Sequence, residues 1–174
     1  MVEVVLRAVR VDVGSSTPLL LLEEVAGIRV LPIFIGATEA TNVAYALQGV
    51  ESPRPMSHDL MGNIIVALGA QLFAAEITEL HDNTFYANLR LLRDREEINV
   101  SARPSDAVAL ALRVGAPILV NDDLMAAEGK IMDLEDDDIE VEVEVREADV
   151  SNEADLVAEL REFLDTIRPE DFGS

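Results

Sequence analysis

The chain has 174 residues, a formal net charge of −21 and no cysteine. A chain of this length buries about 70% of its unfolded surface, which is enough for one domain with its own core. No disulfide scaffold is possible, and two histidines with carboxylates are a thin supply of ligands for a zinc site.

Apolar stretches bounded by turn residues predict most of a sheet. Three strands are expected near the start, at residues 2–13, 18–25 and 28–36. A hairpin is expected further on, with strands at 71–80 and 84–92 around a His-Asp-Asn turn, and a turn at 93–97 leads into one more strand. With short loops between strands and helices, the fold class is α+β, a mixed or antiparallel sheet with packed helices.

Two helices are expected between these groups of strands. The first covers residues 36–49, opens near Thr38 and Glu39 and closes at Gly49. The second covers residues 57–69, with Ser57 as its N-cap. Its expected apolar face consists of Leu60, Met61, Ile64, Ile65 and Leu68.

A third helix follows the last of these strands, in the run ARPSDAVALALR at residues 102–113. Pro104 suits the first turn of a helix, and Ser105 or Asp106 can accept hydrogen bonds from the free N–H groups there. The residues after Asp106 leave almost no polar face, so a buried helix is expected. Arg103 and Asp106 are therefore held on a stiff junction between a strand and a core helix.

An internal repeat is suggested by an offset of 67 positions. Ile33, Ile35, Thr38, Glu39, Ala40 and Ala44 then correspond to Val100, Ala102, Ser105, Asp106, Ala107 and Ala111. Each half would consist of strands followed by a helix whose first turn carries a hydroxyl and an acid. Capping residues that are common at helix starts would explain the same pattern without duplication. The two junctions differ in charge, because one has Gly36 where the other has Arg103.

The character of the chain changes towards its end, where residues from 128 onward include 18 of the 34 acidic side chains. We expect two parts: a domain at 1–132, and an acidic C-terminal extension at 133–174 with a strand at 139–145 and an amphipathic helix at 152–169. A broad basic face for nucleic acid is disfavoured. Local phosphate contacts remain open to Arg54, Arg90, Arg93, Arg95, Arg103 and Arg113.

The residues with reactive or charged side chains suggest one candidate site. His58 can move a proton near neutral pH, and Asp59 beside it could bind a metal or orient it, although capping at a helix start explains the acid equally well. Arg103 could grip a phosphate and Asp106 hold a cation, or the two could simply pair to lock the junction. Glu39 joins them as the counterpart of Asp106 in the repeat.

Three blocks in this order and spacing resemble the bifunctional nuclease family: RPMSHDLMGNII at 54–65, TFYANL at 84–89, and the RPSDA block within 102–113. The likeness covers roughly residues 1–130. It implies hydrolysis of phosphodiester bonds in DNA and RNA with a divalent metal, Mg²⁺ or Mn²⁺.

The resemblance also implies roles for individual residues. The catalytic set would be His58, Asp59, Arg103 and Asp106, with His58 as base or leaving-group acid. Arg54 and Arg103 would bind the substrate, and Asp59, Asp106 and Glu39 would surround the metal.

A second interpretation from a different class stays open. The chain could be a non-catalytic regulatory or assembly module whose polar junctions are structural and whose acidic extension binds a protein partner. Under either interpretation we expect a homo-oligomer, a dimer or trimer, because the chain is rich in apolar strands and carries an additional apolar helix. The start has no basic-then-apolar leader and no run of about 18 apolar residues occurs, so a cytoplasmic protein without membrane contact is expected.

Overall fold

The computed structural model describes residues 1–12, 14–50 and 52–132. Its strands are β1 (Val2–Val11), β2 (Pro18–Glu24), β3 (Arg29–Phe34), β4 (Gln71–His81), β5 (Thr84–Arg93), β6 (Glu96–Ala102), β7 (Ile118–Val120) and β8 (Lys130–Ile131). Its helices are α1 (Ala37–Leu47), α2 (Ser57–Ala67), α3 (Pro104–Val114) and α4 (Asp122–Glu128). The strand at 139–145 and the helix at 152–169 that the sequence predicts lie outside the described residues.

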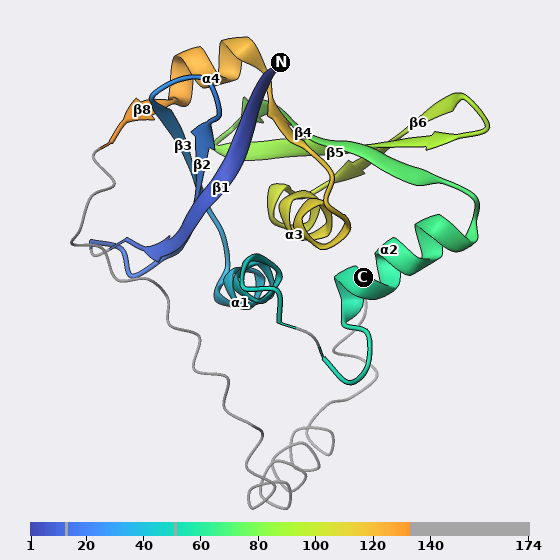
Figure 1. Ribbon diagram of the computed structural model, residues 1–174. Coiled ribbons are helices and arrows are strands. Elements are labelled where there is room, and N and C mark those ends of the chain that lie inside the picture. The colour runs from blue at the N-terminus through green and yellow to red at the C-terminus, as the bar shows by residue number, and fades with distance from the viewer. Residues whose placement is uncertain (13, 51, 133–174) are drawn as a thin grey trace, which may run out of the picture. The chain divides into compact units, whose positions relative to one another are not determined.

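All eight strands belong to one sheet, in the order β6-β5-β4-β7-β1-β2-β3-β8. Neighbouring strands are antiparallel except β4 and β7, which pair in parallel. Helices α1 and α3 lie against the sheet and against each other (Figure 1). The predicted α+β class with a mixed sheet is confirmed.

The core lies between the sheet and its helices and includes residues of α1, α3 and α4. Leu20 and Leu22 of β2 and Ile77 of β4 are fully buried, and so is the segment Ala107–Ala111 of α3. The helix predicted to be buried from its lack of a polar face is buried, and its small alanines leave room for close approach to the strands. The described residues contain no helix long and apolar enough to cross a membrane.

The predicted repeat is visible in the fold. Each half consists of three antiparallel strands and a helix, namely β1-β2-β3-α1 and β4-β5-β6-α3, and the two groups of strands flank β7. Helices α1 and α3 both have 11 residues, and their bounds differ by the predicted 67 positions. Gly36 and Arg103 occupy the equivalent N-cap positions with nearly the same backbone angles, φ −75° and ψ 162° against φ −73° and ψ 148°.

The predicted hairpin turn between β4 and β5 and the predicted turn at 93–97 are both confirmed, and the second also joins an antiparallel pair, β5 and β6. Asp82 and Asn83 between β4 and β5 have φ of 47° and 59°, and Asp94 and Arg95 between β5 and β6 have φ of 50° and 71°. Two consecutive residues with positive φ are typical of the turn that matches the twist of paired strands. Gly49, predicted to end α1, also has a positive φ of 64°, and its N–H bonds to the carbonyl of Ala46.

Helix α2 corrects two predictions. It begins at Ser57, so Met56 rather than Ser57 is the N-cap, because Asp59 accepts a hydrogen bond from the backbone N–H of Met56 at 2.9 Å. Its predicted apolar face is also mostly uncovered. Ile65 packs on the core, but Leu60, Met61, Ile64 and Leu68 are 42 to 65% exposed.

The reason is that α2 meets α3 through Gly62, the buried residue of the helix. A Cβ at Gly62 would lie 3.0 Å from a methyl group of Val114, so little room is left between the helices. An apolar stripe shows which face of a helix is suited to burial, but it does not show what covers that face.

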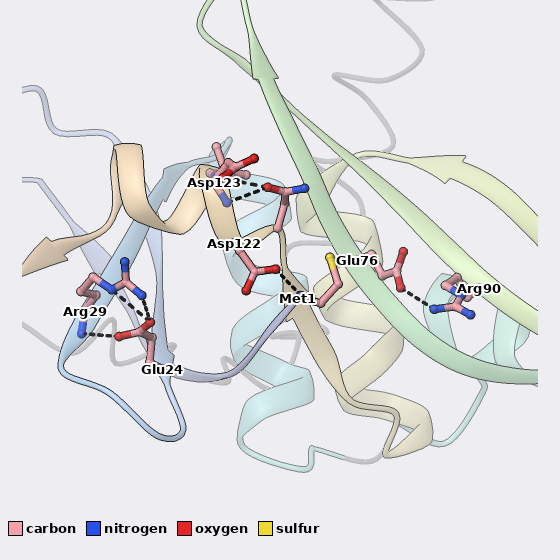
Figure 2. A network of polar contacts seen from close by, with 9 residues as sticks. Met1, Glu24, Arg29, Glu76, Arg90, Asp122 and Asp123 are labelled. Carbon is pink, nitrogen blue, oxygen red and sulfur yellow. Dashed lines mark hydrogen bonds and ion pairs between the residues drawn. The ribbon is translucent and has the colours of Figure 1, made fainter.

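Ion pairs join neighbouring strands and hold the amino terminus against the start of α4, as Figure 2 shows. The carboxylate of Glu24 accepts hydrogen bonds from the backbone N–H of Arg29 at 3.1 Å and from its Nε at 3.0 Å. The hydrogen bond from the Arg29 side chain lowers the pKa of Glu24. The amino group of Met1 pairs with Asp122, next to the cap that Asn121 provides for α4 by accepting from the N–H groups of Asp123 and Leu124.

Candidate functional site

The starts of three helices bring four of the predicted site residues together. Arg103, the N-cap of α3, donates from Nε to Oδ2 of Asp106 at 2.8 Å and from Nη2 to Oδ1 at 3.2 Å. Its Nη1 donates to Oε1 of Glu39, in the first turn of α1, at 2.8 Å. His58, in the first turn of α2, has Nε2 3.3 Å from Oδ1 of Asp106. We call Glu39, His58, Arg103 and Asp106 the junction cluster.

Burial differs across the junction cluster. The side chain of His58 is 12% exposed and that of Asp106 is 30% exposed, whereas Arg103 is 64% exposed. The imidazole is therefore held inside while the guanidinium reaches the surface. Ser105 and Asp106 were predicted as possible caps of α3, but no side chain caps that helix, since Asp106 turns to Arg103 and His58 instead.

The charges of the junction cluster stabilise one another. Partial burial on its own would raise the pKa of Asp106, but the hydrogen bonds from Arg103 and His58 outweigh it and lower that pKa. The hydrogen bonds to Asp106 and then Glu39 raise the pKa of Arg103. Asp106 is therefore an anion and Arg103 a cation throughout the neutral range.

The structure does not bring Asp59 into the junction cluster. Its Oδ1 lies 3.4 Å from Nε of Arg113, and its other oxygen caps Met56. Arg113 also donates to the backbone carbonyl of Val50 at 2.8 Å. Asp59 and His58 are neighbours in sequence that use their side chains on different partners, as residues about 100° apart on a helix do.

The other arginines take varied positions. Arg90 pairs with Glu76 and Glu97, both at 2.8 Å, so its charge is used within the sheet. Arg54, predicted to bind substrate, is exposed in the segment between α1 and α2. Arg93 and Arg95 are exposed at the turn between β5 and β6.

The donor set does not fit a divalent cation as it stands. Both oxygens of Asp106 and one oxygen of Glu39 accept hydrogen bonds from Arg103, and Asp59 lies with Arg113. Among the described residues, no three histidine or acidic side chains are placed to hold a metal ion. The predicted ligands Asp59, Asp106 and Glu39 are thus not gathered around one point.

A cavity of about 300 Å³ adjoins the junction cluster. Arg103 and Glu39 line it, so cluster and cavity share two side chains. Its other walls include Phe34, Asn83 and Phe85. The sequence suggested only a turn at Asn83, and no sequence signal placed this turn beside the start of α3.

Comparison with known proteins identifies a family and several relatives of this chain. The sequence model of the bifunctional nuclease domain matches residues 20–133. An uncharacterised protein of Mycobacterium tuberculosis is 46% identical over 170 residues, which cover 98% of this chain and 97% of that protein. Bifunctional nuclease 1 of Oryza sativa is 30% identical over 94 residues, 52% of this chain and 28% of the plant protein.

A second plant protein, bifunctional nuclease 2 of Arabidopsis thaliana, is 26% identical over 117 residues, 66% of this chain and 35% of its own length. The chain therefore matches only about a third of each plant nuclease. The family match spans well over half of the chain and contains the whole junction cluster. The chain belongs to the bifunctional nuclease domain family.

Proposed function

We propose that this protein is a nuclease that hydrolyses phosphodiester bonds in DNA and RNA at the junction cluster. The observation that carries the proposal is the convergence of His58, Arg103 and Asp106 from two helices far apart in the sequence. A histidine for proton transfer and an arginine for phosphate are the two groups that such hydrolysis needs in the absence of another cation. Membership of the family supports the same activity.

Asp106 would orient His58. With its proton on Nε2, the imidazole donates to Oδ1 of Asp106, which leaves the lone pair of Nδ1 as a base. Arg103 in turn holds Asp106 through two hydrogen bonds, so the carboxylate cannot rotate freely. Both supports come from the first turn of α3, which is fixed by the core.

Arg103 would bind the phosphate. A guanidinium has five N–H donors, and the contacts to Asp106 and Glu39 use three hydrogen bonds. Two donors thus remain on a side chain that is 64% exposed. They suit two oxygens of one phosphate, with no need to break the pairs that position the arginine.

A reaction consistent with these positions is as follows. The oxygen of a water molecule attacks phosphorus while Nδ1 of His58 takes its proton, and the bond from phosphorus to one bridging oxygen breaks. The leaving oxygen takes a proton from solvent. Arg103 balances the negative charge that builds on the phosphate oxygens.

Metal dependence stays a prediction from the family resemblance, and we assign no step to Mg²⁺ or Mn²⁺. The carboxylates of Glu39 and Asp106 could bind such an ion only if Arg103 moved away from them. Assay of the protein with EDTA and then with added Mg²⁺ or Mn²⁺ tests this point directly.

One observation favours the alternative, a non-catalytic regulatory or assembly module. Arg103, Asp106 and Glu39 are paired with one another, as in a structural lock between helices. Such a lock would hold α1 and α3 together without any chemistry. The two functions are separated by the test below.

The test uses two histidine variants of the highly purified protein. His58→Ala should lower the rate of cleavage of a fluorescent single-stranded oligonucleotide by at least about tenfold. His81→Ala is the matched control, because His81 is 73% exposed at the end of β4 and touches no member of the junction cluster. Equal activity in wild type and His58→Ala would refute the proposed role and point to a contaminating nuclease or to the non-catalytic module.

A further inference from the structure

The cavity beside the junction cluster is built from both halves of the fold. The first half contributes the end of β3 and the start of α1, with Phe34, Gly36 and Glu39. The second contributes the turn between β4 and β5 and the start of α3, with Asn83 and Arg103 among its residues. Its volume of about 300 Å³ lies at the lower end of the range for small-molecule sites, about 300 to 1,000 Å³.

The chemistry of the walls is mixed in a particular way. Phe34 is 57% exposed although it ends a strand, and Phe85 faces the same cavity from β5. Asn83 adds an amide with both a donor and an acceptor. Aromatic faces together with a polar edge suit a flat ring that carries hydrogen-bonding groups, whereas a bare phosphate would gain nothing from two phenylalanines.

Ser105 provides an independent observation. It lines the cavity and is only 6% exposed, and no hydrogen bond joins its hydroxyl to another of the described residues. The Ser105 oxygen is not among the fully buried side-chain atoms of the described residues that lack a partner, so the hydroxyl is open to the cavity that it lines and can bond to a ligand there. A ligand whose polar edge reaches Ser105 would find a donor and an acceptor in this hydroxyl.

The position of Arg103 connects the cavity to the cleavage site. This side chain lines the cavity and belongs to the junction cluster, so a ring in the cavity and a phosphate on Arg103 would lie next to each other. A nucleotide has this arrangement of a base and a phosphate joined through a sugar.

We propose that the cavity binds one unpaired nucleobase, next to the phosphate held by Arg103, and that the protein therefore prefers single-stranded nucleic acid. The inference rests on the proposed nuclease function and specifies its substrate. A base in a duplex is stacked and paired, and must be unstacked before it can enter such a cavity. An unpaired base is free to stack on aromatic side chains.

Binding is measured by fluorescence anisotropy with two labelled 12-nucleotide probes. One is oligodeoxythymidylate, and the other has the same phosphates and sugars but no bases. The wild-type protein should bind the probe with bases at least about fivefold more tightly. A duplex of the same length should bind less tightly than the single strand with bases.

Three variants of the full chain locate the effect in the cavity. Phe34→Ala removes an exposed ring, and Asn83→Gly removes the amide while keeping the positive φ of 59° that glycine adopts readily. Ser105→Ala removes only the hydroxyl. Each should reduce the preference for the probe with bases and leave binding of the baseless probe unchanged.

Phe73→Ala is the control for Phe34→Ala. Phe73 is a phenylalanine of similar exposure, 51%, on β4, and it packs under Arg90 rather than lining this cavity. Equal loss of preference in Phe34→Ala and Phe73→Ala would overturn the assignment. Equal binding of the two probes by the wild type, or no binding of either, would overturn it as well.

Cleavage is read separately from binding, so the two proposals can fail independently. If the wild-type protein prefers the probe with bases but cleaves neither DNA nor RNA, the base-binding proposal is supported and the nuclease proposal is refuted. If it cleaves single and double strands equally and shows no preference between the two probes, the nuclease proposal is supported and the base-binding proposal is refuted.

Discussion

Replacing Arg103 separates catalysis from structural locking most clearly. Arg103→Ala removes three hydrogen bonds to two carboxylates, Asp106 and Glu39. The arginine is largely exposed, and exposed ion pairs each contribute about 0.2 to 1 kcal/mol, so we expect a loss of about 0.5 to 2 kcal/mol in the free energy of unfolding. For a chain of this size that lowers Tm by up to about 8 °C.

The effect on activity should be larger than the effect on stability suggests. Loss of the phosphate contact and of the group that orients Asp106 should reduce kcat/KM by at least about tenfold, or about 1.4 kcal/mol of transition-state stabilisation. Arg103→Lys keeps the charge but cannot hold one carboxylate through two nitrogens, so it should recover part of the stability and little of the activity.

Arg90→Ala is a matched control for Arg103→Ala. Arg90 also bonds to two carboxylates, those of Glu76 and Glu97, but it lies outside the junction cluster and the adjoining cavity. Its removal should lower Tm by a similar amount and leave kcat/KM within about twofold of wild type. If Arg103→Ala and Arg90→Ala both lose only stability, Arg103 is a structural lock and the nuclease proposal fails at this residue.

Three further predictions follow from particular contacts. Gly36→Ala would place a Cβ 2.3 Å from Oε2 of Glu39, so this carboxylate should shift and kcat/KM should fall. Tm should change little, because the end of a flexible side chain can move. Loss of folding in this variant would refute the prediction. The pKa of Asp106 is lowered from its ordinary value of 3.8, so the ionised carboxylate stabilises the fold above pH 3.8 and this stabilisation is lost as pH falls through the lowered pKa. The unfolding free energies of wild type and Asp106→Asn, measured by denaturant titration, should therefore converge only in acid. The exposed residues Leu60 and Ile64 of α2 are proposed to lie in a contact between copies of the chain, so light scattering should give a dimer or trimer for wild type and a smaller species for the Leu60→Glu/Ile64→Glu variant; a wild-type mass of 19.0 kDa would exclude the contact.

Periodicity predicted the elements well because each pattern depends on neighbours in sequence. The alternation in β1, the turn residues Asp82 and Asn83, and the proline that opens α3 are local signals, and all three elements form as expected. The offset of 67 positions between the halves is also a property of the sequence alone, and the bounds of α1 and α3 repeat it.

The site was predicted only in part, since contacts between distant segments decide it. Each member of the junction cluster was a candidate from its residue type and its place near a helix start. The sequence does not show, however, that Asp59 turns to Arg113 while His58 turns to Asp106. The cavity depends on the approach of the turn at Asn83 to the start of α3, for which no local pattern exists.

The exposure of the apolar face of α2 was not predicted either, because it also depends on a contact between distant segments. The helical spacing of Leu60, Ile64 and Leu68 indicated a face suited to burial, and that property is intrinsic to the helix. Whether that face is covered depends on how α2 packs against α3. The two helices meet at Gly62, where a Cβ would lie 3.0 Å from a methyl group of Val114.

The difference between the two halves explains why the junction cluster forms once rather than twice. Each half places an acid in the first turn of its helix, Glu39 in α1 and Asp106 in α3, but only the second has an arginine at the N-cap. At the equivalent position Gly36 has no Cβ, and the space that a Cβ would need is taken by the carboxylate of Glu39. One arginine can therefore bind both acids, and it still has two donors for a phosphate. A second arginine at position 36 would compete for Glu39, so the glycine leaves this carboxylate to Arg103.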